Sequence, residues 1–194
     1  MPITILIAGC FTGKIFDSRN KDKIEVGKTT INEAIILLGK PFFRQTMFTS
    51  TGNYVMLKYF FSKQYTYTRS GAGISVRLFY LEFKNDTLNA KIYDSSFKED
   101  LTGFPNENYK NIKISQSDKK HVLNLLGNPS GVALCPSYVR RFSEKCRGAS
   151  LIWSWVYNDP IPEKSKIINV SFDEKGTVIA VDVVMSLNEA PFTF

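Results

Sequence analysis

One pattern occurs twice in this chain of 194 residues, and it constrains the fold more than any other feature. Residues 29–41 align without a gap to residues 117–129, and both copies start with a hydroxyl residue and end in Leu-Leu-Gly, one polar residue and proline. The apolar residues of the first copy fall at the spacing of one helical face: Ile31, Ala34, Ile35 and Leu38. Each copy therefore predicts a short helix that buries one side.

The ends of both predicted helices are marked in the sequence. Thr30, with Glu33 three residues later, forms a capping-box pattern in which each side chain satisfies a backbone N–H that the helix leaves free. Gly39 and Gly127 follow the last apolar residue, and a proline two positions later prevents the helix from resuming.

Apolar and aromatic segments of strand length follow each predicted helix. They cover residues 54–61, 74–83 and 88–93 after the first helix, and 151–157, 167–172 and 178–185 after the second. Asn85-Asp86 and Glu174-Lys175-Gly176 predict the turns of two antiparallel hairpins. The predicted fold class is therefore α+β, with two tandem units that each combine a helix with an antiparallel sheet.

These patterns divide the chain into six predicted segments. They are a signal remnant (1–10), a tether (11–25), a first repeat (26–99), a linker (100–111), a second repeat (112–188) and a C-terminal tail (189–194). Residues 43–52 and 131–150 are expected to be long loops within the two repeats.

A helix that ends in Leu-Leu-Gly-x-Pro and leads into an aromatic strand and a hairpin resembles the BamE (SmpA/OmlA) family of small outer-membrane lipoproteins. The Gly-x-Thr step that opens the family's helix matches Gly27-Lys28-Thr29, and its Trp-x-Tyr strand matches Trp155-Val156-Tyr157. The tandem arrangement is also similar to the β-lactamase-inhibitor-protein fold. The family has one such unit, whereas this chain has two, so the resemblance implies a fold and a binding role without naming a partner.

Residues Ile7-Ala8-Gly9-Cys10 resemble a bacterial lipobox. The resemblance implies that Cys10 carries lipid and tethers the rest of the chain to a membrane. Phe11 is not the aspartate associated with retention in the inner membrane, so the periplasmic face of the outer membrane is the expected location. Because residues 1–8 contain no lysine or arginine, the alternative is that residues 3–8 form an edge strand.

Cys135 and Cys146 remain as an even pair around a polar segment. A disulfide between them would close a short loop and would persist in an oxidising compartment. The alternative is two unpaired thiols in a reducing compartment. Two cysteines and one distant histidine, His121, do not supply the four ligands of a zinc site, so no metal or other cofactor is expected.

Charge and motif content also limit the function. The net charge is +7, but the lysines are scattered, so nucleic acid is not an expected partner. His121 is the one residue that a Ser–His–Asp or Cys–His arrangement could use, and its place on the second predicted helix favours an exposed side chain with no catalytic role.

The remaining candidates are residues for recognition. Trp153 and Trp155 lie two apart and share one strand face, while Arg140, Arg141 and Arg147 belong to the cysteine-closed loop. The alternatives are core packing for the tryptophans and an ordinary solvated loop for the arginines.

The expected function is a non-enzymatic, lipid-anchored scaffold that binds envelope proteins. The alternative is a secreted or periplasmic inhibitor or binding protein.

Overall fold

The computed structural model describes residues 11–13, 16, 18–67, 71–100, 107–159 and 164–187. The lipobox with Cys10, residues 101–106 of the predicted linker, and the predicted tail (189–194) lie outside these ranges. Within them, no helix is both long and apolar enough to cross a membrane.

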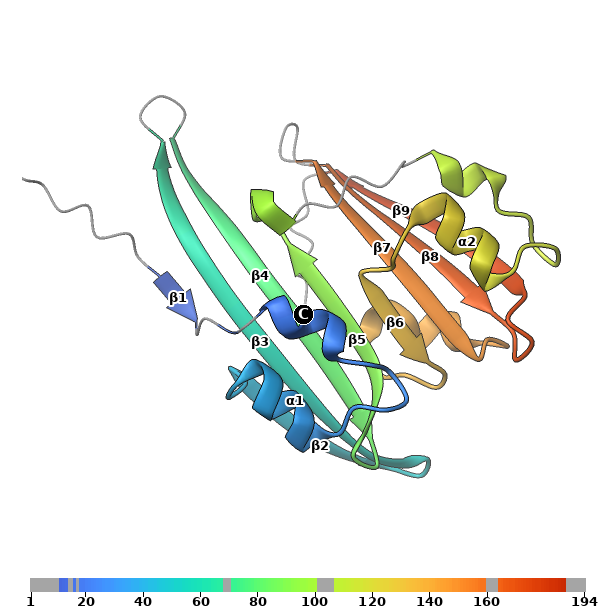
Figure 1. Ribbon diagram of the computed structural model, residues 1–194, viewed down its shortest axis with the longest axis horizontal. Helices are drawn as coiled ribbons and strands as arrows, with labels where there is room; N and C mark the ends of the chain where they lie inside the picture. Colours follow the sequence, from blue (N-terminus) through green and yellow to red (C-terminus); the bar gives the residue numbers. More distant parts are fainter. Residues whose placement is uncertain are drawn as a thin grey trace, which may run out of the picture.

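Nine strands form one antiparallel sheet, which runs through the whole described chain (Figure 1). The strands are β1 (Phe11–Gly13), β2 (Phe43–Thr49), β3 (Gly52–Tyr67), β4 (Gly71–Lys84), β5 (Thr87–Ser95), β6 (Gly131–Leu134), β7 (Leu151–Asp159), β8 (Lys164–Phe172) and β9 (Val178–Leu187). Their order is β1-β3-β4-β5-β6-β7-β8-β9, and β2 pairs with the other part of the β3 edge. The α+β class with an antiparallel sheet is therefore confirmed.

The six predicted apolar segments all form strands, and three short strands were missed. β1 lies in the predicted tether, β2 in the predicted loop 43–52, and β6 in the predicted loop 131–150. Most side chains of β2 are exposed, so the segment lacks the apolar alternation by which a strand is recognised. β6 has four residues, too few to show a period.

Both predicted helices are present, as α1 (Ile31–Leu38) and α2 (Lys119–Leu126). Thr30 and Glu33 form the expected capping box on α1, and the Asp118 side chain accepts from the backbone N–H of His121 on α2. Gly39 and Gly127 end the helices with φ of +83° and +72°, a region that favours glycine. The remaining helical turns are short: η1 (Ser18–Lys23), η2 (Lys98–Asp100), η3 (Asn108–Asn111), α3 (Arg140–Ser143) and η4 (Glu144–Cys146).

The same hydrogen bonds attach both helices to the sheet. The N–H of Leu88 in β5 donates to the Thr29 carbonyl, and the Leu88 carbonyl accepts from the Gly27 N–H. In the second half, the N–H of Val178 in β9 donates to Ser117 and its carbonyl accepts from Ser115. The segment before each helix also follows one pattern, since Asn20 and Asn108 donate to carbonyls near the ends of α1 and α2.

The strands of the two halves are not separated, because β5 pairs with β6. Ala90 lies opposite Ala133, and Ile92 lies opposite Gly131. This pairing crosses the predicted linker (100–111), so the sheet is continuous where the sequence predicted a separation. Sequence pattern could not show it, because the contact joins residues about forty positions apart.

Three apolar clusters make up the core of the described part of the chain. The first lies between α1 and β3–β5 and includes Leu38, Leu57, Phe79 and Phe83. The second lies between α2 and β7–β9 and includes Leu126, Trp155, Ile168 and Phe172. The third lies on the opposite side of the sheet, where Val139 and Phe142 pack on Ile92 and Ile152.

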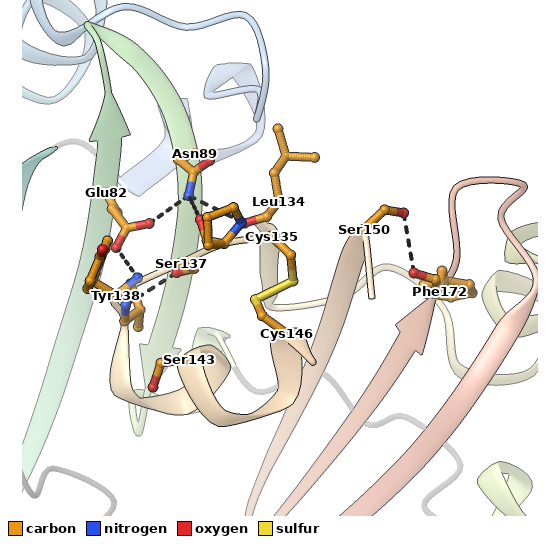
Figure 2. Close-up of a disulfide and its surroundings, with 12 residues drawn as sticks. Glu82, Asn89, Leu134, Cys135, Ser137, Tyr138, Ser143, Cys146, Ser150 and Phe172 are labelled. Atoms are coloured by element: carbon orange, nitrogen blue, oxygen red, sulfur yellow. Dashed lines mark hydrogen bonds between the residues drawn. A yellow bond between two sulfur atoms is a disulfide. The ribbon is translucent and has the colours of Figure 1, made fainter. Parts of the chain in front are cut away.

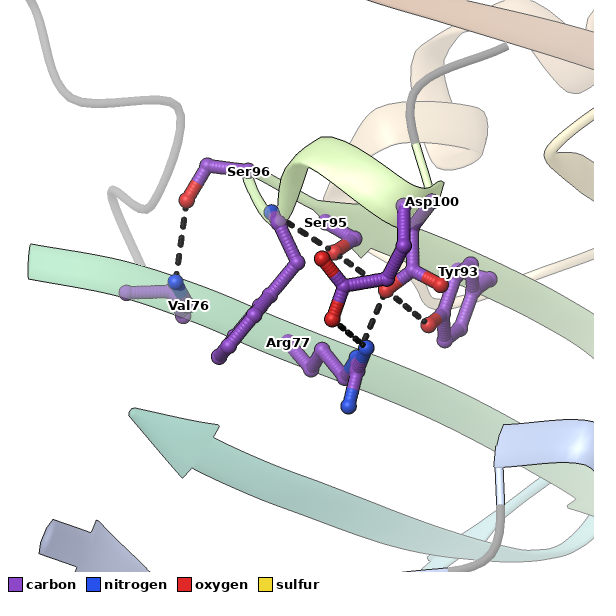
Figure 3. A network of polar contacts seen from close by, with 8 residues as sticks. Val76, Arg77, Tyr93, Ser95, Ser96 and Asp100 are labelled. Atoms are coloured by element: carbon purple, nitrogen blue, oxygen red, sulfur yellow. Dashed lines mark hydrogen bonds and ion pairs between the residues drawn. The ribbon is translucent and has the colours of Figure 1, made fainter. Parts of the chain in front are cut away.

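Asp100 ties the end of η2 back to the sheet (Figure 3). Its Oδ2 accepts from Arg77 Nε at 2.6 Å, Ser95 Oγ at 2.7 Å and Tyr93 Oη at 2.9 Å. Burial acts to raise the pKa of the Asp100 carboxyl, but these hydrogen bonds outweigh it and hold the pKa below its usual value. Burial also raises the pKa of Tyr93 to about 12. Asp100, the first residue of the predicted linker (100–111), therefore has a structural role.

Candidate binding surface

The two faces of the sheet are covered differently. Both α1 and α2 lie on one face, in front of the strands in Figure 1. Strand alternation therefore directs residues such as Leu57 and Tyr59 toward α1, and Lys58 and Phe60 away from it. We call the side away from both helices the open face.

A loop closed by a disulfide covers the middle of the open face (Figure 2). Cys135 and Cys146 are bonded, with their Cα atoms 5.3 Å apart, so the predicted disulfide is confirmed. Residues 135–149, here called the disulfide loop, contain α3 and η4. Val139 and Phe142 of this loop are buried against β5, β6 and β7, which explains why the loop lies flat on the sheet.

Glu82 and Asn89 fix the start of the disulfide loop. Glu82 is fully buried on β4, and its carboxylate accepts from the Tyr138 N–H and from Asn89 Nδ2, both at 2.7 Å. Asn89 Nδ2 also donates to the Pro136 carbonyl at 2.9 Å. Burial raises the pKa of the Glu82 carboxyl, although the hydrogen bonds from Asn89 and Tyr138 act in the opposite direction. The Tyr138 N–H therefore donates to the Glu82 carboxylate, in place of the backbone carbonyl that it would meet in a strand.

Two ion pairs fix the end of the same loop. The Arg141 guanidinium contacts both carboxylate oxygens of Asp94, at 2.9 and 3.3 Å, and the Asp94 side chain is 2% exposed. Lys145 pairs with Asp182 of β9. The loop is therefore held by groups on β4, β5 and β9, in addition to its disulfide.

The structure corrects three of the five predicted interface residues: Arg141, Trp155 and Trp153. Arg141 is largely buried and serves the ion pair with Asp94, so it is not a free surface arginine. Trp155 is 2% exposed in the core under α2, and its Nε1–H donates to the Gly127 carbonyl at 3.2 Å. Trp153 lies beside it, half-buried, with its ring 4.9 Å from that of Phe172. Both tryptophans follow the core-packing alternative.

Arg140 and Arg147 remain exposed on the disulfide loop. His121 is exposed on α2, as the sequence predicted. No group of three His, Cys, Asp or Glu side chains that could hold a metal occurs among the described residues.

A set of apolar side chains along the open face of β2, β3 and β4 had not been expected from the sequence; it is here called the aromatic strip and consists of Phe42, Phe43, Phe60 and Ile74. Phe42, Phe43 and Ile74 are 58%, 46% and 67% exposed. The rings of Phe42 and Phe60 are in contact, with centroids 5.9 Å apart. Phe43 is opposite Lys58 in the β2–β3 register, and Gln64 is opposite Ile74, so these residues face the same side of the sheet.

Tyr138 connects the disulfide loop to the β2–β3 hairpin. Its ring meets that of Tyr54 edge-on at 4.7 Å, and it is half-exposed. Hydrogen bonds with the Thr51 and Thr49 hydroxyls lower the pKa of the Tyr138 hydroxyl. The signal that could have located this surface is the aromatic content of residues 42–60, but its exposure depends on β2, a segment for which the sequence predicts a loop.

The charges around the aromatic strip have one sign. β2, β3 and β4 contain a single acidic residue, Glu82, which is buried, whereas Lys58 and Lys84 lie on the open face. Lys58 Nζ lies 5.9 Å from the centre of the Phe60 ring, and partial burial lowers the pKa of its ammonium group. At the other end of the open face, β7 and β8 carry three polar side chains that are buried: Ser154, Asn169 and Ser171 are 0%, 1% and 5% exposed.

No family model and no curated protein sequence matches this chain. Among solved structures, the chain is similar to a Streptococcus mutans protein described as a "putative beta-lactamase inhibitor protein". The two share 12% sequence identity with a TM-score of 0.48, and the comparison covers 87% of this chain and 98% of the other. The resemblance to the BamE family has no support from these comparisons.

Proposed function

We propose that this chain is a protein-binding module that uses the aromatic strip on the open face as its contact surface. The observation that carries the proposal is the exposure of Phe42, Phe43 and Ile74 on the open face along β2, β3 and β4, strands whose single acidic residue, Glu82, is buried. Large apolar side chains gathered in one exposed area are typical of interaction sites. Aromatic residues, phenylalanine included, are enriched in the buried centres of protein interfaces.

The charges indicate what kind of partner fits. Lys58 and Lys84 border the strip, and Arg140 and Arg147 extend the positive charge onto the disulfide loop. A partner with acidic residues around an apolar centre would complement this surface, and the attraction would speed association at low salt. Binding of this kind requires no bond chemistry, cofactor or metal.

The proposal includes an extracytoplasmic location. Disulfides such as Cys135–Cys146 persist in oxidising compartments. We therefore retain the lipid anchor at Cys10 as a proposal, with the open face directed at envelope proteins on the periplasmic side of the outer membrane. The test is the mass of the membrane-extracted protein: an acyl-sized increment that disappears in Cys10→Ser supports the anchor, and an unmodified soluble protein opposes it.

We also propose that the two halves are related units joined edge to edge. The recurrence of the hydrogen bonds around Leu88 and Val178 supports this relationship. The two halves would then differ chiefly on the open face, where the first exposes the aromatic strip and the second has the buried polar side chains of Ser154, Asn169 and Ser171.

The binding proposal is tested by retention of partners from an envelope extract. Phe43→Asp and Ile74→Asp each place a charge in the aromatic strip, and Ile36→Asp places the same charge on the outer side of α1, where Ile36 is 72% exposed. We expect a partner that the wild type and Ile36→Asp retain, that both strip variants lose, and that moderate salt releases. Equal retention by all four proteins would contradict the proposal.

A second candidate function is inhibition of an enzyme. The specific observation in its favour is the disulfide loop, which is fixed at both ends and so loses little conformational freedom on binding. An inhibitor needs no acyl chain, so full activity of soluble Cys10→Ser against a purified target would favour this candidate over the anchored scaffold.

A further inference from the structure

The outer edges of β5 and β9 are built alike, but they are occupied differently. Near the start of each strand, one residue forms two backbone hydrogen bonds with the segment that precedes a helix. This residue is Leu88 in β5 and Val178 in β9. Each then has a register irregularity one residue later, between Leu88 and Ala90 and between Val178 and Ala180. The backbone groups beyond these positions therefore point the same way in both strands.

In β5, the outward edge is occupied by β6. The register places Lys91 opposite Val132, and the Tyr93 N–H donates to the Ser130 carbonyl at 2.9 Å. Tyr93 lies five residues after Leu88, and the residue at the same distance from Val178 is Val183. The backbone N–H and C=O groups of Val181, Val183 and Met185 therefore face the outer edge of β9.

That edge of β9 has no strand partner within the described ranges. It also lacks the features that usually prevent an edge strand from pairing, since its sequence, Val-Ile-Ala-Val-Asp-Val-Val-Met-Ser-Leu, contains no proline, lysine or arginine. Its single charge, Asp182, is paired with Lys145. Val184 and Met185 are 44% and 67% exposed.

We propose that β9 pairs with β9 of a second copy of this chain, in an antiparallel and two-fold symmetric arrangement that extends the sheet. Such a contact uses the same edge on both copies, so it closes at a dimer. β9 is apolar and has no series of charges that would recognise a different partner. A second β9 is therefore the strand that matches its edge best.

The charge of Asp182 selects the register. With the two-fold axis at Val183, the pairing covers residues 179–187 of both copies, and Asp182 lies opposite Val184 of the second copy. With the axis at Asp182, the two carboxylates would face each other directly, which is unfavourable. The first register also sets Val181 opposite Met185, so apolar side chains meet on the helix-covered face.

The test is the association state of the full chain, with its disulfide intact, measured by sedimentation equilibrium over a range of concentrations. We expect a reversible dimer. Val184→Asp sets acidic residues opposite Asp182 at two places and should raise the dissociation constant about tenfold or more. Val184→Lys, at the same site, sets an opposite charge there and should keep the dimer. Ile36→Asp, on the exposed side of α1 and outside both proposed contact surfaces, should leave association unchanged.

Amide exchange of the wild type makes the test independent of how the variants fold. Protection of the Val181, Val183 and Met185 amides should be strong at high concentration and decrease on dilution. A monomer with unprotected amides would overturn the proposal, and so would a monomer with protected amides, which would mean that the chain covers its own edge. Open-ended oligomers, or a dimer that Val184→Asp leaves intact, would overturn it as well.

Discussion

The Arg141 guanidinium forms a two-point ion pair with the Asp94 carboxylate, which lies 47 residues earlier on β5. The pair fastens α3 to the open face, and Asp94 has almost no contact with solvent. Removing only Arg141 would leave a buried carboxylate without its counter-ion. Removing one partner of such a pair typically costs about 3 kcal/mol or more.

We therefore expect Arg141→Met to lower the free energy of unfolding by about 3 kcal/mol, and Arg141→Met with Asp94→Asn to lower it less, since the double variant has no unpaired charge. Chemical denaturation of the two single variants and the double variant measures the coupling. Arg140→Met is the matched control, because Arg140 is exposed on the same helix. Strictly additive losses would show that the pair does not fasten the loop.

Glu82 gives a prediction for the pH dependence of stability. Because burial raises the pKa of its carboxyl in the folded protein, the folded state holds a proton that the unfolded state releases near the ordinary value of 4.5. Stability therefore decreases as pH rises above that value, and levels off above the folded-state pKa. Glu82→Gln has no such proton, so its stability relative to wild type should improve as pH rises through this window. Thermal melts of both proteins at several pH values measure the difference, and a difference that is constant with pH would contradict the account.

The disulfide contributes to stability chiefly by restricting the unfolded chain. Cys135 and Cys146 are separated by 11 positions, and a loop of that size corresponds to about 2–3 kcal/mol. Cys146→Ser should lower the melting temperature under oxidising conditions and have little effect in excess reductant. An equal loss in both conditions would mean that the side chains matter for packing alone.

Leu126 tests the apolar side of α2. Its side chain is 2% exposed in the cluster beneath the helix, so Leu126→Ala should lower the free energy of unfolding by about 2–4 kcal/mol. Leu38→Ala should have a similar effect, because Leu38 is the matching residue of α1. Ile36→Ala, on the exposed side of α1, is the control and should be close to neutral. Urea denaturation compares the three variants, and a loss at Ile36 equal to that at Leu126 would oppose the assignment of faces.

The features that sequence could predict depend on neighbours along the chain. The capping box at Thr30, the helix ends at Gly39 and Gly127, and the turns that precede Thr87 and Thr177 are all local patterns. The disulfide was also predictable, because only one even pair remained once Cys10 was set aside.

The features that sequence missed depend on contacts between distant segments. Arg140 and Arg141 are adjacent and alike in sequence, but only Arg141 meets a carboxylate, and that carboxylate comes from β5. Nothing near Asp94 in the sequence indicates this contact, because the disulfide loop reaches β5 only through the pairing of β5 with β6. The aromatic strip likewise depends on a contact between segments, since only the pairing of β2 with β3 brings Phe42 and Phe43 to the open face.

The most direct test of the central claim is site-specific photo-crosslinking in cells that express the full chain. A photoreactive phenylalanine analogue at Phe43 reports on the aromatic strip, and the same analogue at Phe48, which is 78% exposed on the other side of β2, is the control. The account predicts a discrete crosslinked protein from position 43 that is absent from position 48 and is lost when Ile74→Asp is added. The same products from both positions, or none from position 43, would contradict the assignment of the open face as the binding surface.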